Sequence, residues 1–181
     1  MDAVHPRIGE VVDELEDSHR ELVTVVTSIP EDRRDLAAHE GRWSIAQQLE
    51  HLAIVEDGIG RLLSKLIKQV VAADVREMHS EPIRHTIDHL RVVEPTLRIV
   101  APEGVVPTGQ VAAGDALERL TAARTRLIGA VRSASGYDLA SVSAPHPILG
   151  PLNAYQWALF VAHHERRHLV QIRAVAGMAD A

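Results

Sequence analysis

The chain has 181 residues, of which 46% are hydrophobic and 24% are charged, so it is long enough for one domain with a substantial core. A formal net charge of −6 without a long basic tract argues against nucleic acid as the main partner. The chain contains no cysteine, which excludes disulfides, thiolate metal ligands and cysteine nucleophiles and fits a reducing compartment.

No apolar run approaches the roughly 20 residues that span a bilayer, and the first residues lack the basic and apolar regions of a signal peptide. We therefore expect a cytoplasmic protein without a membrane partner, folded as a single domain over residues 1–181.

Apolar residues recur at intervals of three, four and seven from about Pro6 to Ser28, which predicts a first long helix. Pro30 ends this helix, because proline cannot donate the backbone hydrogen bond that would continue it. Residues 31–42 are mostly polar and include Gly41, so we expect them to form an irregular link.

A second helix is predicted from Ser44 to about Ala73. Ser44 and Gln47 match the capping box, in which each side chain bonds to the backbone N–H of the other residue. Gly58 and Gly60 lie in the middle of this helix and weaken it by up to about 1 kcal/mol each relative to alanine.

Residues 74–112 are the least regular part of the chain, since they contain four prolines. A short helix could form at about 81–91, and the rest is expected to be a long connection. Such a connection predicts that the second and third helices do not form a simple antiparallel hairpin.

A third helix is predicted from about Gly114 to Ser133, followed by a loop over residues 141–150. A fourth helix begins near Asn153, which pairs with Gln156 in a second capping pattern, and continues to about Ala176. Strand signals are weak. The sequence therefore predicts an all-α fold, a four-helix bundle with a long crossover between helices two and three.

Two histidines in the last predicted helix are candidate metal ligands. His164 and His168 are four residues apart, so they share one face of the helix and could chelate one divalent cation. His51, in the middle of the second helix, could add a third imidazole. The spacing is only moderately specific, because the chain has 11 histidines and the pair His85 and His89 has the same spacing.

Residues 164–168 read His-Glu-Arg-Arg-His, which also satisfies the H-E-x-x-H motif of zinc proteases. Residues 169–174 read Leu-Val-Gln-Ile-Arg-Ala, so the downstream glycine and third histidine of the extended motif are absent. The sequence also lacks clear strands that could dock an extended peptide. We therefore do not expect a protease.

Four segments of the chain carry a family resemblance. They read W-S-I-A-Q-Q-L-E-H-L-A at 43–53, H-P-I-L-G-P-L at 146–152, Q-W at 156–157 and H-E-R-R-H-L-V-Q-I at 164–172. In this combination, the chain resembles the DinB-like superfamily over nearly its whole length.

The resemblance implies a four-helix bundle with a long crossover. It also implies a divalent metal site formed by one histidine of the second helix and two of the last, which correspond by motif to His51, His164 and His168. Relatives include thiol S-transferases that use low-molecular-weight thiols such as bacillithiol or mycothiol, and a thiol-dependent isomerase. Many others are assigned only as metal-dependent hydrolases, so the resemblance implies a site more firmly than a reaction.

Three neutral imidazoles would leave a divalent ion with a net positive charge and an open position, as in catalytic sites. Imidazole ligation suits Zn, Ni, Fe or Cu, of which we expect zinc or nickel. Such an ion could lower the pKa of bound water toward about 7 for hydrolysis, or bind a thiol as a nucleophilic thiolate. The expected partner is a small-molecule substrate, with a low-molecular-weight thiol as one option.

Other polar residues are weaker candidates for catalysis. Glu56 could orient a ligand or act as a base, or could be an exposed helix carboxylate. Glu165 is rotated about 100° from His164 on a helix, so we expect it behind the ligands. Gln171 shares the face of His168 and could bond to a ligand or substrate, or lie at the rim of the bundle.

Five further residues have structural interpretations. We expect His146 to stabilise a turn, with the mouth of the site as the alternative. Trp43 and Trp157 are interpreted as packing anchors. We expect Arg166 and Arg167 to lie on a solvated face, although they could instead pair with acidic residues of the first helix, such as Glu14 or Glu16, or attract an anionic thiol.

A second class of function stays open on the sequence alone. The chain could be a non-catalytic metal-binding helical bundle that acts through dimerisation or partner binding, and a homodimer is possible in either class. Dependence of a reaction rate on bound metal would separate the enzyme from this alternative.

Overall fold

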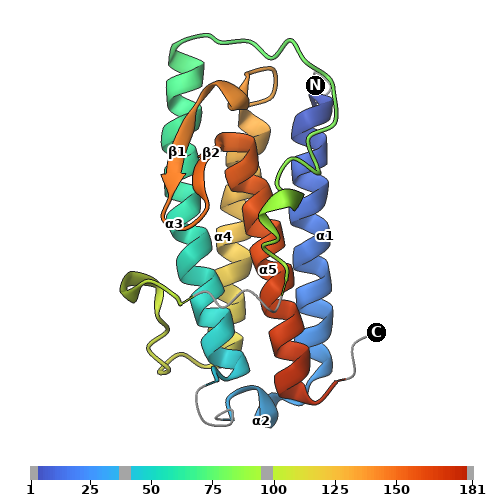
Figure 1. The fold of residues 1–181 in the computed structure, drawn as a ribbon. Coiled ribbons are helices and arrows are strands. Elements are labelled where there is room, and N and C mark those ends of the chain that lie inside the picture. The colour runs from blue at the N-terminus through green and yellow to red at the C-terminus, as the bar shows by residue number, and fades with distance from the viewer. Residues whose placement is uncertain (1–3, 37–41, 95–99, 179–181) are drawn as a thin grey trace.

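A computed structural model describes residues 4–36, 42–94 and 100–178. Four long helices form a bundle (Figure 1): α1 (Pro6–Ser28), α3 (Ile45–Ala72), α4 (Ala113–Ser133) and α5 (Ala154–Ala176). The connections contain the short helix α2 (Glu31–Arg34), the 3-10 turns η1 (Asp88–Leu90), η2 (Glu103–Val105) and η3 (Leu139–Ser141), and the strands β1 (Ser143–His146) and β2 (Gly150–Asn153). The predicted all-α four-helix bundle is confirmed.

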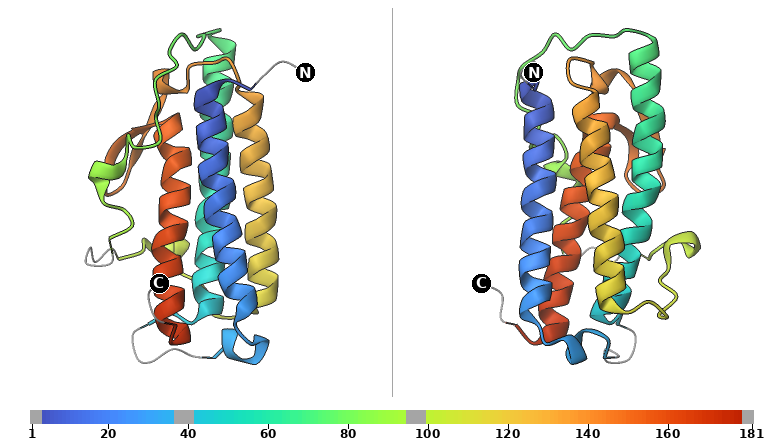
Figure 2. Two further views of the ribbon diagram at one scale, coloured as in Figure 1. Left: turned by 90° about the vertical axis from the view of Figure 1, so that its right-hand side faces the viewer. Right: turned by 180° about the vertical axis from the view of Figure 1, so that it is seen from behind.

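The helices are arranged so that α1 and α3 each pack against both α4 and α5. The adjacent helices α3 and α4 run in the same direction, as do α1 and α5 (Figures 1 and 2). Two parallel neighbours cannot be joined by a short turn, so the chain between α3 and α4 returns along the length of the bundle. The predicted long crossover is therefore confirmed.

Both predicted capping boxes are present. At the start of α3, the Ser44 side chain accepts from the Gln47 N–H at 3.1 Å, and the Gln47 side chain accepts from the Ser44 N–H at 2.9 Å. Asn153 and Gln156 make the same exchange at the start of α5. Because these caps fix where the helices begin, they also fix which residues face the interior.

The segment 141–150 is not the loop that the sequence predicted, because β1 pairs with β2 in an antiparallel hairpin. The strands are only four residues long, and Pro145 lies opposite Pro151 in the register. Neither proline has an N–H to donate, so this position suits a pair that is not hydrogen-bonded. Short strands that contain proline lack the alternating pattern by which a strand is recognised.

Two other segments also differ from the sequence prediction. Only the three-residue turn η1 forms within the region 81–91, where a short helix was considered. The link 31–42 begins with the four-residue helix α2. Gly58 and Gly60 do not interrupt α3, which is continuous from Ile45 to Ala72.

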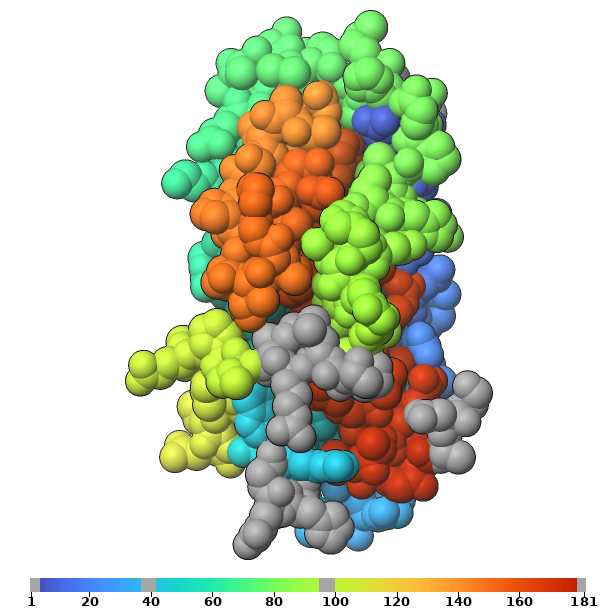
Figure 3. Space-filling view, viewed as in Figure 1, coloured from blue at the N-terminus to red at the C-terminus, as the bar shows by residue number. Residues whose placement is uncertain are grey.

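The crossover and the hairpin cover one face of the bundle. Figure 3 shows the hairpin (orange) and the crossover near residues 81–92 (green) lying side by side over α5. Within the described ranges, none of the helices combines the length and apolar character that a membrane span needs.

The aliphatic core is divided into two clusters by a layer of polar side chains. One cluster includes Leu15 and Leu63, and the other includes Leu22 and Leu49. Between them, each long helix contributes buried polar residues. They are Ser18 of α1, Glu56 of α3, Arg124 of α4 and Glu165 of α5.

Arg124 is the centre of this polar layer and is only 2% exposed. Its guanidinium donates to Glu56 at 2.6 and 3.0 Å and to Glu165 at 2.9 Å. Ser18 donates to Glu165 at 2.6 Å, and His19 bonds to the other oxygen of that carboxylate at 2.9 Å. The layer therefore joins all four helices through charged hydrogen bonds.

The two carboxylates of the layer differ in environment. Burial raises the pKa of Glu56, and the positive charge of Arg124 only partly opposes this. Burial also acts to raise the pKa of Glu165, but its hydrogen bonds from His19 and Ser18 and the charge of Arg124 outweigh burial and lower it. Both carboxylates depend on Arg124 for their counter charge.

Glu77, near the start of the crossover, links that segment to α1 and α5. Its carboxylate pairs with Arg7 at 3.3 Å and accepts from the Tyr155 hydroxyl at 2.9 Å and from the His79 N–H at 2.9 Å. Burial alone would raise the pKa of Glu77, but these hydrogen bonds and the charge of Arg7 lower it. Burial and the bond to Glu77 raise the pKa of Tyr155 well above its ordinary value.

We expect Arg124→Met to destabilise the protein by about 3–5 kcal/mol, because it leaves two buried carboxylates without a counter charge. Urea unfolding of the variant and the wild type measures this difference. Arg126→Met is the matched control, because the Arg126 side chain is 63% exposed and pairs with Asp57 at the surface. This substitution should lower the free energy of unfolding by less than about 1 kcal/mol. Equal costs for the two variants would contradict a stabilising role for the layer.

Glu77→Gln should destabilise the protein by about 1–3 kcal/mol at pH 7, because it weakens charge-assisted hydrogen bonds. A carboxylate whose pKa is depressed by folding contributes stability above its unfolded-state pKa of about 4.3. That contribution is lost as the pH falls through the folded-state pKa. The difference from wild type, measured by urea unfolding at a series of pH values, should shrink below pH about 4; a constant difference down to pH 3 would oppose this account.

Candidate metal centre

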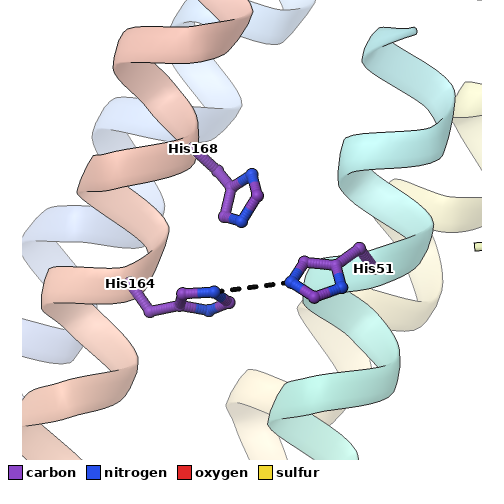
Figure 4. A group of neighbouring side chains, drawn as sticks. All are labelled: His51, His164 and His168. Atoms are coloured by element: carbon purple, nitrogen blue, oxygen red, sulfur yellow. Dashed lines mark hydrogen bonds between the residues drawn. The ribbon is translucent and has the colours of Figure 1, made fainter. Parts of the chain in front are cut away.

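The side chains of His51, His164 and His168 converge between α3 and α5 (Figure 4). His164 and His168 project from successive turns of α5, and His51 faces them from α3. The Nε2 atoms of His51 and His164 are 3.4 Å apart, and the candidate donor nitrogens of the three rings all lie within 4.8 Å of one another. The three histidines predicted to share a site therefore lie together.

Hydrogen bonds on the outer nitrogens orient two of the rings. His51 Nδ1 lies 2.7 Å from the carbonyl oxygen of Val105, which can only accept, so Nδ1 carries the proton and Nε2 is left with its lone pair. His168 Nδ1 lies 3.4 Å from Gln48 Oε1. Bonds of this kind to the second ring nitrogen are characteristic of metal-binding histidines.

Gln48 and Val105 were not identified from the sequence. Gln48 precedes His51 by three residues and so shares its side of α3, which was an available signal. Val105 acts through its backbone carbonyl, which no side-chain pattern reports. It belongs to the turn η2 in the crossover, 54 residues from His51 in the chain.

The three rings are in an environment that keeps them neutral. Burial lowers the pKa of His51, although the bond to Val105 opposes this. Burial lowers the pKa of His168 to about 3, and burial together with the neighbouring rings places the pKa of His164 well below its ordinary value. Neutral imidazole is the form that binds metal ions.

The donor set fits a divalent cation. Nitrogens bound at about 2.0–2.1 Å to one tetrahedral, zinc-like ion lie about 3.4 Å apart, and the spacing of His51 and His164 is 3.4 Å. A pair at the 4.8 Å limit would have to approach by about 1.4 Å to bind the same ion. Within the described ranges, no other group of three His, Cys, Asp or Glu residues has this geometry, and the pair His85 and His89 gains no third donor.

The histidines lie at the wall of a cavity of about 860 Å³. Apolar side chains from α3, α5, the crossover and the hairpin turn form most of its lining, and Val55, Leu62, Val105, Ile148, Trp157 and Phe160 are among them. Polar lining residues include Arg42, Gln171 and Arg167. The described lining residues include no Asp or Glu.

Aromatic rings flank the histidines. Trp43 contacts His51 with ring centroids 4.9 Å apart and stacks on His168 at 6.3 Å. Phe160 stacks on His164 at 5.4 Å. Trp43 is therefore a packing residue, as predicted, but what it packs against is the histidine cluster.

His146 combines the two roles considered from the sequence. Its Nδ1 accepts from the N–H groups of Ile148 and Leu149 at 3.2 and 3.1 Å, which stabilises the hairpin turn. Its ring also lines the cavity and contacts Trp157 and Phe160. Trp157 is 5% exposed and packs in the core, in agreement with its predicted role.

The predicted catalytic candidates lie in two different places. Glu56 and Glu165 bond to Arg124 in the polar layer and do not line the cavity, so they are not positioned to act as a base there. The alternative that Glu56 is an exposed carboxylate is wrong, since it is 3% exposed. Gln171 does line the cavity.

The two arginines between His164 and His168 also differ, and the expected solvated face is wrong for Arg167, which is 7% exposed. Arg166 pairs with Glu14 of α1 at 2.5 Å, as considered from the sequence. Arg167 donates to the carbonyl oxygens of Val92 and Glu94 at 3.2 and 2.5 Å. These bonds attach the crossover to α5 at the edge of the cavity.

Comparison with known proteins identifies related sequences. A family model described as DinB superfamily matches residues 14–172, a range that includes the three histidines. The chain is 28% identical over 134 residues to the uncharacterized protein YuaE of Bacillus subtilis (strain 168), which covers 74% of this chain and 76% of that protein. No solved structure shows a significant match.

We expect His51→Ala to remove most of the divalent metal that copurifies with untagged protein, because two imidazoles hold an ion far less tightly than three. Elemental analysis by mass spectrometry measures the content, with about one ion per chain expected in the wild type. His163→Ala is the control, since His163 neighbours His164 but lies outside the cluster. Equal metal content in wild type and His51→Ala would rule out His51 as a ligand.

Proposed function

The chain belongs to the DinB superfamily, and from that premise we propose that it is a metal-dependent thiol S-transferase acting on a small molecule. His51, His164 and His168 are the proposed ligands of a divalent ion, with zinc or nickel preferred. The observation that carries the choice of reaction is the cavity lining, which is largely apolar and has no carboxylate among its described residues.

A bound divalent ion supplies a Lewis acid that lowers the pKa of a coordinated thiol or water. Hydrolysis is commonly assisted by a base that accepts a proton from water, but the described cavity lining has no Asp or Glu, and the candidates Glu56 and Glu165 are paired with Arg124 instead. A thiol bound to an ion held by the three histidines would need no such base, because the ion would supply the acidity. The lining therefore supports transfer to sulfur over hydrolysis.

The surrounding residues have distinct proposed roles. The Val105 carbonyl and the Gln48 side chain hold the outer nitrogens of His51 and His168, which keeps the inner nitrogens directed into the cluster. Trp43 and the other aromatic rings exclude water from the histidines. Gln171 offers an amide at the cavity wall that can hydrogen-bond to a bound thiol or to its acceptor.

The reaction transfers an electrophilic carbon group to the thiol sulfur. The thiolate sulfur forms a bond to that carbon, the bond from the carbon to its leaving group breaks, and the thiol proton passes to solvent. Positively charged Arg42 and Arg167 line the cavity, which supports thiols that bear a carboxylate.

The test measures conjugation of cysteine-based low-molecular-weight thiols to monochlorobimane, alongside hydrolysis of p-nitrophenyl acetate, with metal-free and metal-reconstituted protein. We expect the conjugation rate to depend on added metal. In His164→Ala the rate should fall by more than the roughly 10–100-fold that is typical when a residue behind a metal ligand is changed. His163→Ala should retain the wild-type rate.

Two results would overturn this proposal. Metal-dependent ester hydrolysis without metal-dependent thiol consumption would indicate a hydrolase. Bound metal with no effect on either rate would favour the non-catalytic bundle that acts through dimerisation or partner binding.

A further inference from the structure

Gly58 occupies a position in α3 where the backbone does not require glycine. Its φ is not positive, so no left-handed conformation is involved. A Cβ added there would meet only the end of the Arg61 side chain, at 3.9 Å, so no close approach requires glycine either. Glycine in the middle of a helix nevertheless reduces helix stability.

The position of Gly58 relates it to the histidine cluster. Seven residues separate it from His51, which is close to two helical turns, so both face the same side of α3 about 10 Å apart along the axis. Gly58 lines the same cavity as the histidines, together with Val55 and Leu62. The missing side chain therefore leaves open space in the cavity wall two turns from the proposed metal site.

The hairpin turn provides the other side of this space. It lies beside the middle of α3 (Figure 1), and Pro147, Ile148 and Leu149 of the turn line the cavity. The region between Gly58 and the turn is thus bordered by apolar groups on both sides. It is continuous with the histidine cluster, because one cavity contains both.

We propose that this region, between Gly58 of α3 and the hairpin turn, binds an apolar tail of the substrate. The substrate class is a small molecule whose reacting head lies at the histidines and whose alkyl or aryl tail extends along α3 to Gly58. This inference rests on the proposed function, because the head is placed by the metal site. Gly58 is then a specificity-determining residue, since any side chain there would shorten the space for the tail.

Gly60 provides a matched control within the same helix. It follows His51 by nine residues, or two and a half turns, and so faces the opposite side of α3. It lines a separate groove, together with Lys65 and Arg126, and a Cβ there would meet nothing within 4 Å. Substitutions at Gly58 and Gly60 should therefore affect the helix alike but the cavity differently.

The experiment uses Gly58→Leu and Gly60→Leu in the metal-reconstituted full chain. The probes are acetohydroxamate, hexanohydroxamate and octanohydroxamate, which share a metal-binding head and differ in tail length. Isothermal titration calorimetry measures their affinities. In the wild type, affinity should rise by about fourfold for each methylene that is buried.

Gly58→Leu should bind acetohydroxamate as the wild type does but lose the gain from the longer tails, whereas Gly60→Leu should keep that gain. Octanohydroxamate affinity that is the same in Gly58→Leu and wild type overturns the inference, as does a wild type without any gain from tail length. A wild type that binds none of the probes, acetohydroxamate included, instead overturns the proposed metal site, and this inference with it.

Thermal unfolding of the metal-free proteins provides a readout that is independent of the metal. Gly58→Ala and Gly60→Ala should each raise Tm by about 2–4 °C, because both replace a helical glycine without a clash. If Gly58→Leu does not fold, Gly58→Ala takes its place in the titrations. It should then reduce octanohydroxamate affinity relative to Gly60→Ala and leave acetohydroxamate affinity unchanged, and equal affinities for octanohydroxamate would overturn the inference.

Discussion

The buried pairing of Arg124 with Glu56 and Glu165 is the constraint on which the geometry of this bundle depends. The hydrophobic effect that holds the aliphatic core together is non-directional, whereas a desolvated arginine requires its carboxylates at hydrogen-bond distance. Because Glu56 belongs to α3 and Glu165 to α5, their shared partner on α4 sets the height of one helix relative to the other. That height decides whether His51 and His164 meet.

Two adjacent residues of α5 contribute to the polar layer and to the histidine cluster, respectively, from different sides of the helix. Glu165 is directed to the polar layer inside the bundle, while His164 is directed to the cavity, because successive helical residues are about 100° apart. The negative charges are thereby kept with Arg124, and the imidazoles lie among apolar and aromatic groups. This separation leaves the histidines neutral and available to a cation.

The topology supplies what the helices alone lack. Because α3 and α4 are parallel neighbours, the connection between them must return along the bundle, and it passes the histidines on the way. It contributes the Val105 carbonyl that orients His51, and it is attached to α5 by the bonds of Arg167. The hairpin between α4 and α5 closes another part of the same cavity. The residues that complete the site are therefore found in connections rather than in the bundle core.

The sequence by itself determined the parts of this protein that depend on neighbours in the chain. Apolar periodicity and the capping boxes at Ser44 and Asn153 located the long helices, and a spacing of four placed His164 and His168 on one face. The length of the segment after α3 was enough to predict the crossover. Each of these signals is complete within a few turns of helix or within one connection.

Only the tertiary structure decided which distant side chains meet. Glu56 and Glu165 were candidates for catalysis because their spacing shows that a carboxylate is near a histidine in the chain, but not which partner the carboxylate finds when it is buried. Arg124 lies 68 residues from one and 41 from the other. Hydrogen bonds, ion pairs and the cavity itself are set by packing between elements that are far apart in the chain. Local sequence patterns carry no information about which of these elements lie together.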